Sequence, residues 1–135
     1  MSLDRAALIA ALHALLPEDA VLEQEEARRP YECDGLSAYR QLPYVVALPH
    51  SVDEARAVLK LCHEHRIPVV ARGAGTGLSG GALPHAEGVL LSLARLNRIL
   101  KIDPVGLTAT VEPGVRNLAI SEAAAPLGLY YAPDP

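Results

Sequence analysis

Five glycines fall within nine residues of this chain, between residues 73 and 81, and their spacing suits the binding of a phosphate group. They follow residues 67–71, a short apolar run with the composition of a buried strand. Successive backbone N–H groups in such a loop can approach phosphate oxygens closely, and Thr76 and Ser79 add hydroxyl groups. The alternative is that the glycines only let backbone segments pack closely together.

The loop also contains the letters of a dinucleotide fingerprint, Gly-x-Gly-x-x-Gly, at Gly75, Gly77 and Gly80. In a Rossmann fold a helix opens at the third glycine, because its N–H groups hold the pyrophosphate. Gly81 and Pro84 oppose a sustained helix at that point. No lysine follows the glycines, so a Walker loop is excluded as well. A nicotinamide-binding Rossmann enzyme remains a rival that a helix starting at Gly80 would favour.

The sequence does not predict a metal site. His63 and His65 lie two residues apart in an expected helix, where their side chains point about 200° apart and do not readily share one ion. Cys33 and Cys62 are far apart and form no Cys-x-x-Cys motif. Reduced, structural thiols and a solvated helix end are the simpler interpretations.

Composition restricts the classes of partner. The net charge is −4 and Lys60 and Lys101 are the only lysines, so nucleic acid is not an expected partner. No apolar run approaches the roughly 20 residues needed to span a bilayer, and the N-terminus lacks the layout of a secretory signal. We expect a cytoplasmic protein, with docking on the inner face of a membrane through partner subunits left open.

The glycine loop is expected to follow a βαβ unit. Residues 44–48 are a β-branched run closed by Pro49, which is typical of a buried strand. Ser51 and Glu54 then form the capping box of a helix that continues to residue 65, and residues 67–71 form the next strand. The handedness rule for such units makes the two strands parallel neighbours or near neighbours.

The N-terminal part is expected to contain one helix and one long loop. Residues 3–16 have a helical stripe of leucines, with Ser2 as the predicted cap. Residues 23–29 have the composition of a solvated connection and are expected to form a linker or a short strand edge.

Residues 31–42 show no period and are expected to form a surface loop. For Asp34 and Arg40 in this loop, contact with a cofactor or substrate and simple loop hydrogen bonding both stay open.

The C-terminal part is expected to contain a third strand, a hairpin and a helix. Residues 88–93 predict the strand, and residues 99–103 and 107–111 predict the hairpin. A helix of about a dozen residues should follow from Val115. One face of this helix is expected to carry Ala119, Ala123 and Leu127.

Four segments of the chain resemble a known family. Residues 72–82, 111–115 and 130–135, with residues 31–35 near the start, are similar to the flavin-binding domain of the FAD-linked oxidases related to vanillyl-alcohol oxidase. The resemblance is strongest to bacterial glycolate oxidase flavoprotein subunits and D-lactate dehydrogenases. It implies an α+β fold of the PCMH type, with an N-terminal βαβ subdomain and the start of a second, more antiparallel subdomain.

The resemblance also implies a domain division, a cofactor and a set of site residues. Residues 1–42 would be an N-terminal helix and loop, and residues 43–135 the first part of the FAD-binding domain. Some family members attach FAD through a histidine at the position of Thr76, so the FAD is expected to be non-covalent here. The expected FAD-binding residues are Arg72, Gly73, Ala74, Gly75, Thr76, Gly77, Ser79, Gly80, Gly81, Pro113, Gly114, Pro133, Asp134 and Pro135.

The implied function is that of a flavin-dependent 2-hydroxy-acid oxidoreductase that converts glycolate or D-lactate to the 2-oxo acid. In the family, the groups that handle the acid follow the position of Pro135. The chain is therefore expected to supply the FAD-binding part, to lack catalytic residues and to be inactive alone. Other subunits of a glycolate oxidase are the expected protein partners. A non-enzymatic interaction module is the second rival.

Overall fold

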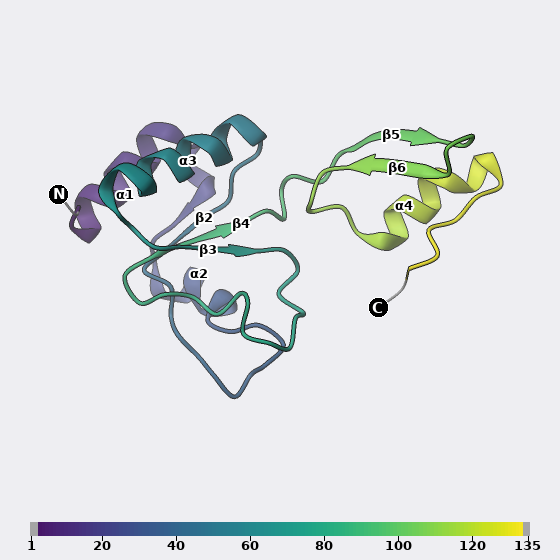
Figure 1. Ribbon diagram of the computed structural model, residues 1–135. Coiled ribbons are helices and arrows are strands. Elements are labelled where there is room, and N and C mark those ends of the chain that lie inside the picture. Colours follow the sequence, from purple (N-terminus) through teal and green to yellow (C-terminus); the bar gives the residue numbers. More distant parts are fainter. Residues whose placement is uncertain (1–2, 134–135) are drawn as a thin grey trace. The chain divides into compact units, whose positions relative to one another are not determined.

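The computed structural model describes residues 3–133, and the chain forms two compact units, Met1–Arg95 and Leu96–Pro135. The first unit contains a mixed sheet with helices, and the second contains a hairpin and one longer helix (Figure 1). Together they make the mixed, α+β architecture that the sequence predicts. Each unit is described by itself below.

The sheet of the first unit has the strand order β1-β2-β4-β3. Its strands are β1 (Val21–Leu22), β2 (Val45–Ala47), β3 (Val69–Arg72) and β4 (Val89–Ser92). β4 lies between β2 and β3 and runs parallel to both, whereas β1 pairs antiparallel with β2. The prediction that the strands of the βαβ unit are parallel near neighbours is confirmed, and β3 forms one edge of the sheet.

The core of the first unit lies around the two central strands. Every residue of β2 and β4 is buried, as expected for apolar strands in the middle of a parallel sheet. Figure 1 shows α1 (Arg5–Leu15) and α3 (Val52–His65) next to each other on one face of the sheet, and α2 (Glu25–Arg28) and the long loops on the other. Leu12 of α1 and Val58 of α3 have no exposed surface, so both helices contribute to this core.

α3 begins and ends as its sequence predicts. The Ser51 hydroxyl accepts a hydrogen bond from the Glu54 N–H at 3.1 Å. The Glu54 carboxylate accepts one from the N–H of His50 at 2.6 Å, one residue earlier than in a standard capping box. Arg66, with a φ of 55°, ends the helix in the left-handed conformation.

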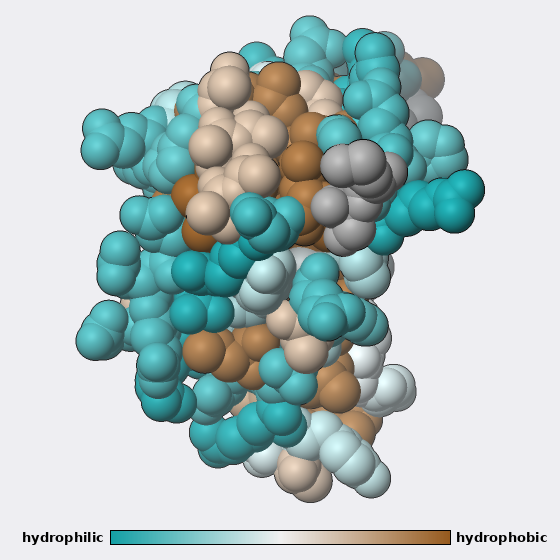
Figure 2. Space-filling model, turned by 90° about the vertical axis from the view of Figure 1, so that its left-hand side faces the viewer, coloured by the Kyte–Doolittle hydropathy of each residue, from teal (hydrophilic) through white to brown (hydrophobic). Residues whose placement is uncertain are grey.

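α1 begins later than predicted. Its cap is Asp4, whose carboxylate accepts from the Ala7 N–H at 2.8 Å, whereas the predicted cap, Ser2, lies outside the described residues. Asp4 is a strong capping residue, which explains the shift. Figure 2 shows tan and brown surface bordered by hydrophilic residues at the level of α1 and α3. The exposed positions of α1 include Ala6, Ala10 and Ala14.

The prediction that residues 23–29 form a solvated connection is wrong in one respect. This segment contains a short helix, α2 (Glu25–Arg28), which continues into a 3-10 turn at Arg29–Tyr31. Acidic residues lie in the first turn of α2 and an arginine in its last, an order that suits the helix dipole. The Arg28 guanidinium also donates to the Pro43 carbonyl at 2.5 Å, which attaches the helix to the start of β2.

The second unit contains the predicted hairpin. β5 (Ile99–Asp103) pairs antiparallel with β6 (Thr108–Val111), and Ile102 lies opposite Ala109. The Asp103 carboxylate closes the turn by accepting from the N–H groups of Val105 and Gly106, at 3.0 and 2.9 Å.

α4 (Asn117–Ala124) packs through a face that the sequence did not predict. Ile120 and Ala124 are buried, whereas Ala123 and Leu127 of the predicted face are exposed. Leu127 belongs to a 3-10 turn (Ala125–Leu127), where the period of an α-helix no longer applies. Among residues 3–133, no helix is long and apolar enough to cross a membrane.

Candidate functional site

The predicted phosphate-binding loop lies where parallel sheets commonly bind ligands, at the carboxyl end of a strand. Residues 73–82, the glycine loop, directly follow β3. No helix occurs between β3 and β4, and Gly81 and Ala82 form a turn that the Leu83 N–H closes onto the Gly80 carbonyl at 3.1 Å. The helix that would favour a Rossmann enzyme is therefore not present after Gly80.

Internal packing does not explain most of the loop glycines. A Cβ atom added at Gly73, Gly77 or Gly81 would have no atom within 4 Å, and none of these residues has a positive φ. Gly80 is equally open but has a φ of 72°. Only Gly75 combines a positive φ with a close neighbour, the guanidinium group of Arg72. The loop thus has a bare backbone facing open space, which a ligand can approach.

The same loop carries unused hydrogen-bond donors. Within the described part of the chain, the backbone N–H groups of residues 74–82 donate no hydrogen bond. The side chains of Thr76 and Ser79 are exposed and likewise have no hydrogen-bond partner there. A row of free N–H groups and hydroxyls is the donor set that a diphosphate needs.

Behind the loop lies a segment that the sequence reasoning did not connect with it. The Arg72 guanidinium donates to the Cys33 carbonyl at 2.7 Å and lies over the Tyr31 ring, 5.4 Å from its centre. A Cβ atom added at Gly35 would lie within 3 Å of the carbonyl oxygens of Thr76 and Gly77, so the two backbone segments pass close to each other. No local pattern in the sequence indicates these contacts, because they join residues about forty positions apart, as the 39-residue separation of Arg72 and Cys33 illustrates.

The structure answers the open question about the two polar residues of this segment in part. Arg40 is exposed and pairs with Glu32 at 2.8 Å, so loop bonding accounts for it. Asp34 is only 6% exposed, and one carboxylate oxygen accepts from the Leu36 N–H at 2.9 Å. Its other oxygen is buried without a hydrogen-bond partner among the residues described.

Pro113 and Gly114, the second predicted FAD-binding segment, lie in the second unit. The Gly114 N–H donates to the Leu96 carbonyl at 2.7 Å. Glu112, 5% exposed, accepts from the Arg98 backbone N–H and from the end of its guanidinium, both at 2.8 Å. These hydrogen bonds lower the pKa of Glu112 and raise that of Arg98. The ion pair fixes the turn, and the sequence reasoning missed it.

Of the predicted C-terminal site residues, only Pro133 can be described. Its carbonyl accepts from the Asn117 side chain at 3.4 Å, which ties this extended end to the first turn of α4. Asp134 and Pro135 lie outside the described residues.

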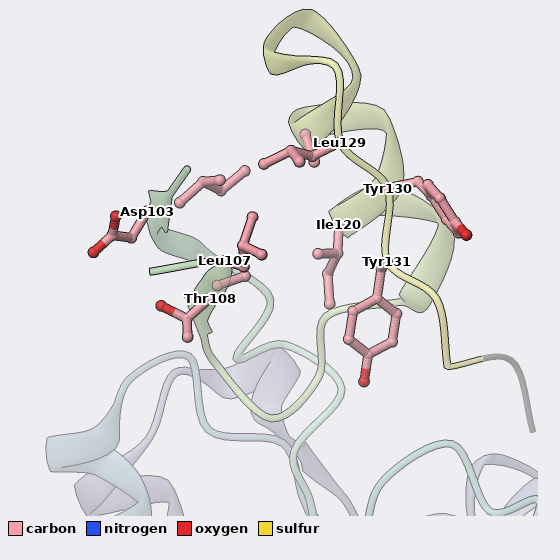
Figure 3. A pocket seen from close by; sticks show the side chains of 10 residues that line it. Asp103, Leu107, Thr108, Ile120, Leu129, Tyr130 and Tyr131 are labelled. Atoms are coloured by element: carbon pink, nitrogen blue, oxygen red, sulfur yellow. The ribbon is translucent and has the colours of Figure 1, made fainter. Parts of the chain in front are cut away.

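A cavity in the second unit is separate from the predicted site residues. It has a volume of about 90 Å³, far below the roughly 300–1,000 Å³ of typical cofactor pockets. Figure 3 shows Leu107 and Ile120 facing each other across it, while the ring of Tyr130 turns away. The cavity is lined by Ile102, Asp103, Leu107, Thr108, Ala109, Ile120, Ala124, Leu129, Tyr130 and Tyr131.

The described residues give little support for a metal site or a reactive thiol. Residues 3–133 contain no group of three or more His, Cys, Asp or Glu side chains that could hold an ion. Burial raises the pKa of the Cys62 thiol to about 11, which makes it a poor nucleophile. Cys33 is partly buried and forms no disulfide.

A mixed sheet with an open, donor-rich glycine loop and no helix after it defines a nucleotide-binding module of a non-Rossmann class. A family model described as "FAD binding domain" matches residues 43–135. The chain belongs to this FAD-binding family, and FAD is its cofactor. The bare backbone of Gly73, Gly77 and Gly81 fits this ligand, since it leaves room for a diphosphate against free N–H groups.

Two sequence relatives and one solved structure show which proteins the chain is similar to. The chain is 58% identical to the glycolate oxidase subunit GlcD of Escherichia coli K12, over 98% of this chain and 26% of that protein. It is 37% identical to the D-lactate dehydrogenase of Anaerostipes hadrus, over 85% of this chain and 24% of that protein. A substrate-bound structure of p-cresol methylhydroxylase matches with a TM-score of 0.77 and 28% identity, over 90% of this chain and 24% of that one. The chain thus spans about a quarter of each.

Proposed function

We propose that this chain is the FAD-binding part of a flavin-dependent 2-hydroxy-acid oxidoreductase. The proposed reaction converts glycolate or D-lactate to the corresponding 2-oxo acid. The observation that carries the proposal is the open glycine loop, whose N–H groups have no partner in the described residues. The 58% identity to a glycolate oxidase subunit supports the substrate class.

The proposed FAD site has three segments. The glycine loop would surround the pyrophosphate with its N–H groups and with the hydroxyls of Thr76 and Ser79. Pro113 and Gly114 would bring a second stretch of backbone to the cofactor, held in shape by Glu112 and Arg98. The third segment is residues 133–135. The full set is Arg72, Gly73, Ala74, Gly75, Thr76, Gly77, Ser79, Gly80, Gly81, Pro113, Gly114, Pro133, Asp134 and Pro135.

Bound FAD would supply the two-electron redox chemistry for oxidising the hydroxyl-bearing carbon of the acid. This chain's residues bind and orient the cofactor. Thr76 has no ring nitrogen that could bond to the flavin, so non-covalent FAD is proposed. The groups that would bind the carboxylate and take the hydroxyl proton are proposed to lie in further sequence of the whole enzyme.

We further propose a division into an N-terminal helix and loop, residues 1–42, and a first FAD-binding part, residues 43–135. The range of the family match supports this division. Association with other glycolate oxidase subunits, in the cytoplasm or at the inner face of a membrane, is the corresponding proposal for partners and location. The name of the related GlcD protein, a subunit, supports it.

The test uses the full-length protein encoded by the gene. It is incubated with FAD and passed through gel filtration, and flavin absorbance is recorded in the protein peak. Glycolate, D-lactate and L-lactate are then added without an electron acceptor. We expect retained flavin and bleaching of its absorbance by glycolate or D-lactate.

A Gly77→Val variant tests directly whether the glycine loop binds FAD. A Cβ atom at this position meets no other atom within 4 Å, but the valine side chain would occupy the face proposed for the pyrophosphate. It should fold normally and retain no FAD. Wild-type protein that retains no FAD would overturn the proposal, and flavin that no 2-hydroxy acid bleaches would overturn the substrate class.

A further inference from the structure

We propose that residues 31–35, here called the rear wall, form part of the FAD site and set FAD affinity by holding the glycine loop from behind. This inference rests on the proposed binding of FAD by the loop. It places functional residues before position 43, where the family match begins. The rear-wall residues are positioning residues: the structure shows them in contact with the loop and with Arg72.

The first connection runs through Arg72, the last residue of β3. Its guanidinium donates to the Cys33 carbonyl at 2.7 Å and lies over the ring of Tyr31. The same group fills the space that a side chain at Gly75 would need. Arg72 therefore lies between the rear wall and the loop backbone, and its charge is used to fasten the two together. A planar guanidinium can stack and donate at once, which a lysine cannot do.

The second connection is a direct backbone contact. A Cβ atom added at Gly35 would lie 2.8 Å from the Thr76 carbonyl oxygen and 2.9 Å from that of Gly77. Gly35 has no positive φ, so its backbone conformation suits other residues, and a side chain is opposed by these carbonyls and by the Leu78 side chain, 2.9 Å away. The rear wall thus fixes how far back the middle of the loop can lie. That position determines where the N–H groups of residues 76 and 77 meet a ligand.

The rear wall itself is held in a defined shape. The Gln41 N–H donates to the Glu32 carbonyl at 2.8 Å, and the Asp34 carboxylate closes a turn onto Leu36. The second Asp34 oxygen is buried and has no hydrogen-bond partner among the described residues.

Loop position matters for affinity because binding groups act over short distances. A displacement of about 1 Å can cost a preorganised catalytic site about a hundredfold in rate. Hydrogen bonds to a bound ligand likewise weaken when donor and acceptor move apart. The glycine loop has few contacts of its own, as most of its residues are exposed. Its preorganisation therefore depends on the contacts behind it, at Tyr31, Cys33 and Gly35.

The test measures FAD affinity of the full-length apoprotein by quenching of flavin fluorescence. Tyr31→Phe keeps the ring under Arg72, whereas Tyr31→Leu removes it. We expect wild-type affinity for the first variant and about fivefold to tenfold weaker binding for the second, from the usual strength of a cation–π contact. Gly35→Ala should weaken binding about tenfold or more, because the loop carbonyls must move.

Two further variants complete the test. One separates the shape of the Arg72 side chain from its charge, and the other is a control for substitution elsewhere in the long loop. Arg72→Lys keeps the positive charge but loses the stack, and it should bind FAD as weakly as Tyr31→Leu. Ser37→Ala changes an exposed residue of the same long loop that has no described hydrogen bond, and it should bind as wild type. Thermal unfolding of each apoprotein shows whether a loss of affinity reflects a loss of folding.

The outcomes distinguish this inference from the proposed function. If wild type retains FAD and Gly77→Val loses it, but Tyr31→Leu and Gly35→Ala bind as wild type, the rear wall has no such role. If wild type itself binds no FAD, the proposed function fails first. If Tyr31→Phe loses as much FAD affinity as Tyr31→Leu, the stacking argument is also overturned.

Discussion

At the scale of single residues, the ion pair between Glu112 and Arg98 connects the two ends of the hairpin in the second unit. Glu112 accepts from both the guanidinium and the backbone N–H of Arg98, so one carboxylate joins the start of β5 to the end of β6. Glu112 directly precedes the turn at Pro113 and Gly114. A charge-assisted, doubly bonded pair gives more rigidity than a single surface contact.

We predict a pH-dependent contribution of Glu112 to stability. Hydrogen bonds from Arg98 lower its pKa in the folded protein. The stabilisation is therefore complete above the unfolded value of about 4.3 and is lost as the pH falls through the lowered folded value. Glu112→Gln should lower the unfolding temperature at pH 7 and have a smaller effect at pH 3, measured by circular dichroism.

The matched control for this prediction is Glu122→Gln, the same change at an exposed position of α4. It should leave the unfolding temperature nearly unchanged at both pH values. An equal effect of Glu112→Gln at pH 7 and pH 3 would show that the ionised pair is not the source of the stability.

At the scale of elements, α3 is the helix that links β2 to β3, the strand that precedes the glycine loop. Its N-terminus is closed by Ser51 and Glu54, and its C-terminus by the left-handed Arg66. Caps of this kind satisfy backbone groups that the helix itself leaves unpaired.

We predict that Ser51→Ala destabilises the chain by about 1 kcal/mol, the usual effect of losing a serine cap. Urea unfolding followed by circular dichroism measures it. Ser37→Ala, an exposed serine outside any helix, should change stability by less than about 0.5 kcal/mol. Equal effects of the two variants would mean that the Ser51 hydrogen bond contributes nothing to the helix.

At the scale of the whole molecule, the two units differ in how their strands are supported. In the first, β4 has a hydrogen-bonded strand on each side and is fully buried. In the second, β5 and β6 form a two-stranded sheet, and every residue of β6 except Val111 is exposed. A lone pair of strands has marginal stability in water.

Hydrogen exchange of this 135-residue chain should reflect that difference. We expect amide protons of β2 and β4 to exchange at least about tenfold more slowly than those of β5 and β6, because local opening is easier where few apolar contacts must break. Mass spectrometry of peptic fragments resolves the four strands. Equal protection in both sheets would contradict the prediction.

The sequence by itself determined the features that depend on neighbouring residues. The β-branched run before Pro49, the capping residues Ser51 and Glu54 and the hairpin around Asp103 are encoded within a few positions, and the structure contains all three elements. The absence of a helix after Gly80 is also a local property, since Gly81 and Pro84 oppose one. The FAD-binding family could be identified from its glycine loop and three further segments.

Only the tertiary structure decided which distant residues meet. The face that α4 buries depends on what the hairpin offers it, so Ile120 replaced the predicted alanines. The residues behind the glycine loop, Tyr31, Cys33 and Gly35, are fixed by a close approach of two loops. Such contacts leave no period in the sequence, because they depend on where the sheet directs each loop and not on the residues beside them.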